Sequence, residues 1–288
     1  MELARRSFLT LGALSALLAL GGCATGASGP APTVSMPNTK VEVQWLGQAA
    51  TKITTPGKKV ILIDPFITNN PKTPAEHKDL AKLGKVDLIL ITHGHGDHTG
   101  DVAALQKMND ATVAGPAGLM ATLVDLGWVP ANKAVRFGKG GKIRPVGTGI
   151  TITQVRAEHS SEVTVPDPAT KKTTTYPGGE PAGFIIEFEN GLRLYHMGDT
   201  GLFGDMRFIG RYYRPDIIMI PIGGHFVMDP KDAAYATNHM LKPAHAIPFH
   251  YGTFPVLVGT PEEYIKELGQ TSTKVHNIKP GDKISFPQ

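Results

Sequence analysis

The stretch Thr92-His93-Gly94-His95-Gly96-Asp97-His98 places three imidazoles and one carboxylate within six residues. It follows the apolar run 86–91, which the pattern predicts to be a buried strand. Neutral imidazole and carboxylate are common protein ligands of zinc and related ions. Because glycine tolerates backbone angles that strain other residues, Gly94 and Gly96 would let the loop fold tightly and aim several side chains at one point. We therefore predict a metal site here; the alternative is a solvated polar loop.

Length and composition favour one large domain. The chain has 288 residues, 41% of them hydrophobic, and its 33 glycines and 23 prolines are spread out, which is typical of a turn-rich α/β fold. Without residues 1–22 it keeps 27 basic and 24 acidic residues, with no dense run of lysine or arginine. We therefore expect no nucleic-acid binding.

The first 40 residues have the pattern of an export signal and a tether. Arg5-Arg6 precede the apolar run 8–20, which is too short for a membrane span of about 20 residues. Leu20-Gly21-Gly22-Cys23 resembles a lipoprotein cleavage box, which predicts removal of residues 1–22 and lipidation of Cys23; an ordinary secretory signal is the alternative. The segment Arg5-Arg6-Ser7-Phe8-Leu9 resembles a twin-arginine signal, with general secretion as the alternative.

These features predict an exported protein, anchored by lipid to the bacterial cell envelope and facing the periplasm or the exterior. Residues 23–40 are rich in Ala, Gly, Ser, Pro and Thr, as in a flexible tether. Cys23 is the only cysteine, which excludes an internal disulfide and a thiolate metal ligand.

Regular patterning begins at residue 41 and defines a domain over 41–288. Apolar runs and alternation predict strands over 41–46, 50–54, 59–64, 86–91, 150–155, 183–188, 192–196, 216–220 and 244–249. Helical spacing covers 101–108 and 117–126, and helices are also expected over 230–241 and 261–268. Two strand-rich segments, each followed by mixed elements, predict two β-sheets with helices packed outside.

Three further candidates lie just past predicted strand ends: His159, Asp199 and His250. Ligands and catalytic groups of α/β folds gather at the carboxyl ends of strands. Taken singly, each has a structural explanation, such as a buried core histidine or a turn aspartate. Their common placement with residues 93–98 points to one site.

His93, His95, Asp97 and His98 match the His-x-His-x-Asp-His motif of the metallo-β-lactamase superfamily. The resemblance covers residues 41 to about 280. It looks closest to the branch of simple metal-dependent hydrolases that includes ascorbate-6-phosphate lactonase. Further segments resembling that branch are 45–47, 64–66, 159–161, 198–205 and 221–226.

The resemblance implies a four-layer αββα sandwich with two divalent metal ions between the sheets. The first ion would be held by His93, His95 and His159, and the second by Asp97, His98 and His250, with Asp199 bridging them. Zinc is the default, and manganese or iron also suit these ligands. Two cations would lower the pKa of a shared water and supply a hydroxide for attack on an ester, lactone or phosphodiester.

Other residues are candidates for supporting roles. Asp64 is expected either to orient a ligand histidine or to form a structural turn. His225 would bind substrate or protonate the leaving group, unless it is a plain loop residue. Tyr251 would polarise a carbonyl. His196 is expected in the core or behind the ligands, and we expect structural or surface roles for His77, His239, His245 and His276.

The sequence thus predicts a dinuclear metal-dependent hydrolase acting on a small-molecule or lipid substrate, with a phospholipase D-like activity as one variant. Two other classes stay open. The chain could be a non-catalytic lipoprotein that binds a metal or an anion on the same fold, or an iron-dependent redox enzyme. The substrate and the oligomeric state do not follow from the sequence.

Overall fold

A computed structural model describes residues 40–287. The predicted signal peptide, Cys23 and all but the last residue of the predicted tether lie outside this range. Within the range, no helix is both long and apolar enough to cross a membrane.

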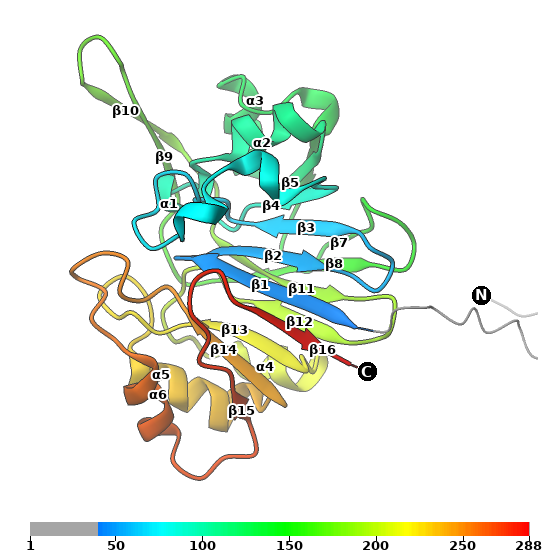
Figure 1. Cartoon of the computed structure of the whole chain (residues 1–288), viewed down its shortest axis with the longest axis vertical. Coiled ribbons are helices and arrows are strands. Elements are labelled where there is room, and N and C mark those ends of the chain that lie inside the picture. Colours follow the sequence, from blue (N-terminus) through cyan, green and yellow to red (C-terminus); the bar gives the residue numbers. More distant parts are fainter. Residues whose placement is uncertain (1–39, 288) are drawn as a thin grey trace, which may run out of the picture. The chain divides into compact units, whose positions relative to one another are not determined.

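Two seven-stranded sheets form the centre of the described domain (Figure 1). The first has the order β16-β1-β2-β3-β4-β5-β6 and contains β1 (Val41–Gly47), β2 (Ala50–Thr54), β3 (Val60–Ile63), β4 (Leu88–Leu90), β5 (Thr112–Pro116), β6 (Ala134–Phe137) and β16 (Lys283–Phe286). The second has the order β15-β14-β13-β12-β11-β8-β7 and contains β7 (Lys142–Ile143), β8 (Thr151–Arg156), β11 (Ala182–Glu187), β12 (Arg193–His196), β13 (Ile217–Pro221), β14 (His245–Phe249) and β15 (Lys274–Val275).

Alternate residues of each central strand serve different layers, because successive side chains point to opposite faces. Ile61 and Ile63 of β3 lie in the core between the sheets, whereas Leu62 packs outward against the helices. In β11, Phe184 and Ile186 point inward and Ile185 points outward. These strands are buried on both faces, which explains their continuous apolar sequence.

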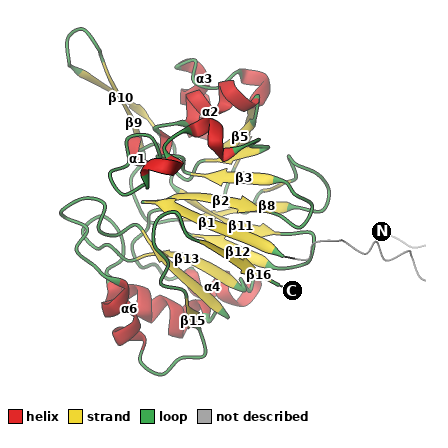
Figure 2. Ribbon diagram, in the orientation of Figure 1, coloured by secondary structure: helices red, strands yellow, loops and turns green. Residues whose placement is uncertain are grey.

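Helices cover both outer faces (Figure 2). The α-helices are α1 (Gly96–Thr99), α2 (Val102–Asn109), α3 (Ala117–Asp125), α4 (Met206–Tyr212), α5 (Pro230–Tyr235) and α6 (Pro261–Leu268). The 3₁₀ helices are η1 (Ala75–His77), η2 (Leu80–Leu83) and η3 (Ala131–Lys133), and η4 (Ala236–Leu241) is a π-helix. Residues of α2 and α3 pack on the first sheet, and residues of α4, α5, η4 and α6 pack on the second. The order helix, sheet, sheet, helix is the predicted αββα sandwich.

The structure differs from the sequence-based prediction in several elements. The helix expected over 230–241 is split, with α5 leading into the π-helix η4. Strands β5, β6, β7, β15 and β16 and the helix α4 were not predicted. The hairpin of β9 (Glu162–Pro166) and β10 (Thr173–Pro177), which projects beside α3 in Figure 1, was also missed, because its mixed polar residues carry no apolar run.

The topology brings several strand ends to one edge. Strands β12, β13 and β14 are parallel, and β8 runs the same way because β11 is antiparallel to both β8 and β12. In the first sheet, β3 and β4 are parallel, and β1 shares their direction through antiparallel β2. The loops that follow these strands therefore meet at the carboxyl edge of both sheets.

Candidate metal centre

The loop between β4 and α1 is held close to the β9 hairpin. A side chain at Gly94 would meet the carbonyl oxygen of Glu162 at 2.9 Å, so only glycine fits there. Neither Gly94 nor Gly96 has a positive φ, and Gly96 begins α1 with open space around it. The expectation of strained glycine angles was therefore wrong, because close approach at Gly94 is what requires the missing side chain.

Three imidazoles form a first group of candidate ligands. Nε2 of His93 lies 3.0 Å from Nδ1 of His95, and His159 completes the set. One nitrogen of each ring lies within 4.8 Å of the others. The His159 ring stands nearly perpendicular to those of His93 and His95, at interplanar angles of 89° and 81°. Nitrogen atoms this close, without a covalent link, are arranged as ligands of one ion would be.

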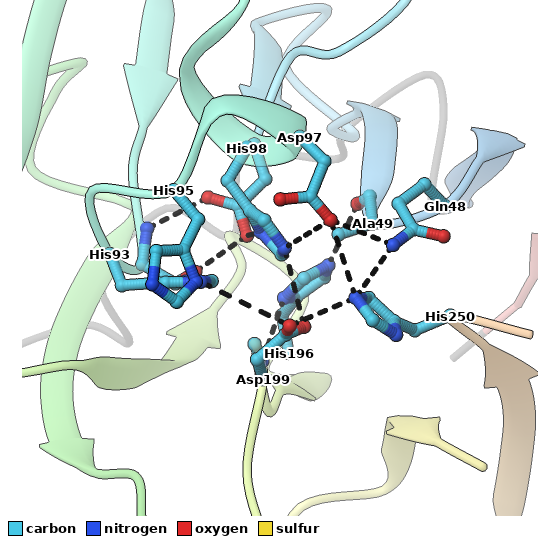
Figure 3. A network of polar contacts seen from close by, with 12 residues as sticks. Gln48, Ala49, His93, His95, Asp97, His98, His196, Asp199 and His250 are labelled. Atoms are coloured by element: carbon cyan, nitrogen blue, oxygen red, sulfur yellow. Dashed lines mark hydrogen bonds and ion pairs between the residues drawn. The ribbon is translucent and has the colours of Figure 1, made fainter. Parts of the chain in front are cut away.

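A second group lies beside the first and consists of Asp97, His98 and His250, whose donor atoms also fall within 4.8 Å of one another. Oδ2 of Asp97 is 3.6 Å from His98 Nε2 and 3.7 Å from His250 Nε2. His98 and His250 are buried, whereas Asp97 is partly exposed and lines a cavity. Figure 3 shows these side chains pointing toward one another.

Asp199 connects the two groups. Its Oδ2 lies 2.9 Å from His250 Nε2 and 3.7 Å from His159 Nε2, and its Oδ1 lies 3.3 Å from His98 Nε2. His93 Nε2 is 4.0 Å away. Asp199 follows Gly198, which has a φ of +62° and whose Cα lies against the side chain of Thr92. The turn after β12 therefore packs against the loop after β4.

Asp64 orients one imidazole of each group. Its Oδ2 accepts hydrogen bonds from Nδ1 of His98 (2.9 Å) and from the hydroxyl of Thr92 (2.7 Å), and its Oδ1 accepts from the Thr92 amide. The Thr92 oxygen in turn lies 3.0 Å from Nδ1 of His93, which places the ring proton there. In both histidines Nε2 is thereby left free to bind a cation. These contacts are the ones that an orienting role for Asp64 requires, and that role stays a prediction.

Sequence reasoning missed two supporting residues. Glu162, the first residue of β9, has its Oε2 2.9 Å from His95 Nε2, which leaves Nδ1 of His95 for an ion. Gln48 follows β1; its Nε2 donates to Asp97 Oδ2 at 2.8 Å and lies 2.8 Å from His250 Nε2. The only signal for Gln48 was its position after the segment 45–47, and Glu162 directly follows the segment 159–161.

Positive backbone φ angles occur at three non-glycine residues of this site, Gln48, Asp64 and His250. Such angles are uncommon outside glycine and tend to concentrate at functional sites, where the surrounding structure over-determines them. Each of these residues follows a strand at the same edge, and hydrogen bonds such as those of Gln48 with His250 and of Asp64 with His98 hold the side chains in place.

The electrostatics favour ionised carboxylates facing the site. Burial alone would raise the pKa of Asp97 and of Asp199, but the imidazoles of His98 and His250 outweigh it and hold both pKa values below the usual range. Burial lowers the pKa of His93 well below its usual value, so this ring is neutral. The same contacts act on the rings: burial would lower the pKa of His98 and of His250, but Asp199 outweighs it and raises both, that of His250 to about 9. These two rings therefore carry protons in the absence of a cation and would release them on binding one, because ionised carboxylates and neutral imidazoles are the states that bind cations.

Buried polar atoms without hydrogen bonds are a second observation that fits a metal centre. Within the described residues, Nε2 of His98 and Oδ1 of Asp199 are buried without any hydrogen-bond partner. Leaving a buried polar atom unpaired costs about 1–3 kcal/mol, and more when it is charged. The two atoms lie 3.3 Å from each other, too poorly aligned for a hydrogen bond, at the junction of the two groups, where a cation would satisfy both. The seven predicted ligands are thus brought together, and their binding of metal stays a prediction.

A cavity of about 510 Å³ opens above the two groups. It is lined by Gln48, Phe66, His95, Asp97, His159, Asp199, Phe226, His250, Phe254 and Leu257. His225 is exposed and is not among the lining residues; its neighbour Phe226 is. Tyr251 packs on Trp45, and its hydroxyl donates to the Ile278 carbonyl (3.5 Å). The catalytic roles expected for His225 and Tyr251 stay predictions.

The remaining histidines lie away from the cavity lining. His196 is fully buried at the end of β12, where its ring packs against Phe249 and its Nε2 approaches the Ala49 carbonyl (Figure 3). Burial lowers its pKa to about 4. This placement agrees with a core position behind the ligands.

Comparison with known proteins shows which family the chain belongs to. Residues 59–251 match the model of the beta-lactamase superfamily domain. Together with 53% identity to a UPF0173 metal-dependent hydrolase of Cupriavidus necator, over 93% of this chain and 95% of that protein, the match shows that the chain belongs to the metallo-β-lactamase superfamily, in its branch of simple metal-dependent hydrolases.

Relatives of lower identity extend the same picture. A UPF0173 metal-dependent hydrolase of Rubrobacter xylanophilus is 42% identical over 84% of this chain and 95% of its own length. Among solved structures, the metallo hydrolase Igni18 of Ignicoccus hospitalis is 33% identical, covers 87% of this chain and all of that one, and superposes with a TM-score of 0.74. The family and the fold expected from the sequence are confirmed.

Proposed function

We propose that the protein is a dinuclear hydrolase that cleaves an ester, lactone or phosphodiester bond. The observation that carries the proposal is the convergence of seven side chains into two adjacent groups that share Asp199, with two buried donor atoms left unpaired at their junction. The membership in a family of metal-dependent hydrolases supports it.

The chemistry would be divided between the ions and the chain. Two bound cations would supply a hydroxide near neutral pH and neutralise the charge that develops on the attacked group. His93, His95 and His159 would hold one ion, and Asp97, His98 and His250 the other, with Asp199 shared. Asp97 lies at the border between the buried donors and the open cavity, where its carboxylate would also accept a proton from the attacking water.

Two other groups would act on the substrate. Gln48 lines the cavity and presents its amide NH₂ beside Asp97 and His250, where it would orient the scissile group. His225, exposed beside Phe226, would have to turn toward the cavity to protonate a leaving group.

The location of the protein is a separate proposal. Export through the signal in residues 1–22 and lipidation of Cys23 would place the enzyme on the cell envelope.

Metal content and turnover of the purified protein test this function together. We expect about two equivalents of metal per chain and hydrolysis of at least one lactone, aryl ester or phosphodiester. Asp97→Ala and His98→Ala should abolish turnover while the circular dichroism spectrum stays that of a folded protein. His239→Ala, an exposed histidine outside both groups, serves as the matched control.

Several outcomes would overturn the proposal. Activity that survives Asp97→Ala or His98→Ala would exclude the mechanism. A protein that binds two ions but hydrolyses no compound of the three classes would favour a non-catalytic binding role. Metal-dependent oxygen consumption without hydrolysis would favour a redox enzyme.

A further inference from the structure

Part of the cavity lining is apolar. It consists of Phe66, Phe226, Phe254 and Leu257, which line the cavity together with the candidate ligands. Phe66 comes from the loop after β3, Phe226 from the loop after β13, and Phe254 and Leu257 from the loop after β14. We call Phe226, Phe254 and Leu257 the apolar wall. The wall and the candidate metal centre face the same space, so a substrate attacked at the centre would touch both.

The apolar wall extends outward into solvent. Phe226 is 57% exposed and Phe254 is 36% exposed. Apolar side chains gathered at the mouth of a cavity mark a binding surface, because keeping them in water gives no stability to the fold. The wall is therefore better explained by a ligand than by packing.

The loops that carry the wall are fixed to each other. The amide of Gly259 donates to the Gly223 carbonyl at 3.1 Å, and the Gly252 amide donates to the Leu257 carbonyl at 2.9 Å. Added side chains at Gly223 and Gly259 would collide with the backbone of the opposite loop, at the carbonyls of His250 and Ile222. The wall is therefore preformed, which lowers the entropic cost of binding a ligand against it.

Among the described residues, no lysine or arginine lines the cavity. Sites that recognise phosphate monoesters or free carboxylates use such cations, because the transfer of a charged group out of water needs compensation. Arg156, which lies over the Phe203 ring, is paired with Glu158 and does not line the cavity. Away from the metal centre, the cavity is thus suited to an uncharged group.

We propose that the substrate is an uncharged ester or lactone whose acyl or alkyl chain lies on the apolar wall. This inference rests on the proposed hydrolase function and narrows it: phosphorylated sugars and small charged esters are excluded as preferred substrates. The chain would extend from the metal centre along Phe226 and Phe254 toward the solvent.

The first test measures kcat/KM of the metal-loaded full chain on p-nitrophenyl acetate, butyrate, hexanoate and octanoate. Because a fully buried methylene contributes about 0.8 kcal/mol and this wall is half open, we expect kcat/KM to rise roughly twofold per added methylene. Phe226→Ala should reduce that slope. Phe208→Ala is the matched control, since Phe208 is 56% exposed on α4 and lies outside the cavity, and it should leave the slope intact.

A second measurement does not depend on turnover. The uncharged fluorophore N-phenyl-1-naphthylamine should bind the metal-free full chain, and Phe226→Ala should weaken that binding at least about fivefold while Phe208→Ala should not. Hydrolysis of all esters with equal kcat/KM, or fluorophore binding unaffected by Phe226→Ala, would overturn the inference and leave the hydrolase function standing. Fluorophore binding at the wall without any hydrolysis would support an apolar ligand and count against the hydrolase.

Discussion

The two halves of the sandwich contribute to the metal centre in opposite ways. The half built on β1 to β6 supplies four of the seven candidate ligands from one short segment, residues 93–98, which spans the loop after β4 and the start of α1. The half built on β7 to β15 supplies three, one after each of β8, β12 and β14. The four ligands of the first half are contiguous in the sequence. The three of the second half are far apart in the sequence and come together only because β8, β12 and β14 are strands of one sheet. A local motif therefore sets the chemistry, and the topology of the other half completes it.

The largest expected effect comes from the residue in the second half that belongs to both groups. Asp199→Ala should remove the carboxylate that connects the two groups and leave His98 and His250 with only the more distant carboxylate of Asp97. We expect a loss of activity well above the roughly 10–100-fold typical of residues behind the ligands, with both metal equivalents lost in plasma emission analysis. Retention of both equivalents would show that the halves do not share this ligand.

Asp64→Asn should give the next largest effect, because Asp64 positions His98 directly and His93 through Thr92. We expect metal affinity to fall about 10–100-fold. Asp101→Asn is the matched control: Asp101 is also buried beside this loop, but its carboxylate binds the amides of Ile67 and Thr68. Equal losses in both variants, measured by competition with a chelating dye, would assign Asp64 to the fold alone.

Glu162→Gln should have a smaller effect, at or below about tenfold in metal affinity. Glu162 supports only His95, and it is half exposed, so water can replace part of its hydrogen bond. The charge of Glu162 is favoured there, since the hydrogen bond to His95 lowers its pKa. Glu158→Gln, which breaks an exposed pair with Arg156, is the control and should leave metal affinity unchanged.

The smallest effect concerns stability at the far edge of the second half. His245 Nδ1 lies 3.0 Å from His276 Nε2, and burial, followed by His245 and Lys274, lowers the pKa of His276 to about 4. As the pH falls from about 6.5 to 4, His276 becomes protonated in the unfolded chain but stays neutral in the native state. The free energy of unfolding therefore decreases over this pH range.

The ring of His276 is partly exposed and solvent screening limits this loss, so we expect at most about 1 kcal/mol. His276→Gln should reduce the difference between urea midpoints at pH 7.5 and pH 4.5. An unchanged difference would show that other buried histidines, such as His196, account for the acid sensitivity.

The contrast between the halves also explains how much the sequence could predict. Strands buried on both faces, such as 60–63 and 217–221, could be predicted because their sequences are continuous apolar runs. Strand β9 and the edge strand β16 alternate polar and apolar residues over only about four positions, and β10 is mostly polar, so pairing with neighbours rather than a long pattern makes them strands. Helix α4 is short and packs through Gly210 against the backbone of η4, which no periodicity shows.

The residues of the candidate site were likewise predictable only in part. Residues 93–98 were evident from composition and spacing, and the distant ligands followed from predicted strand ends and the family resemblance. Gln48 and Glu162 were missed because a single amide or carboxylate has no pattern of its own. Their significance arises from contact with Asp97 and His95 across the fold.

The direction of β1 has a consequence for how the enzyme would meet its surroundings. Val41 pairs with Phe286 at the start of this strand, and Gln48 lines the cavity just beyond its other end. At about 3.3 Å per residue the two positions are roughly 20 Å apart. In Figure 1, the C-terminus and the start of β1 lie at one end of the sheets and α1 at the opposite end. A chain anchored ahead of Val41 would therefore be attached to this domain at the end of the sheets opposite to Gln48 and the cavity.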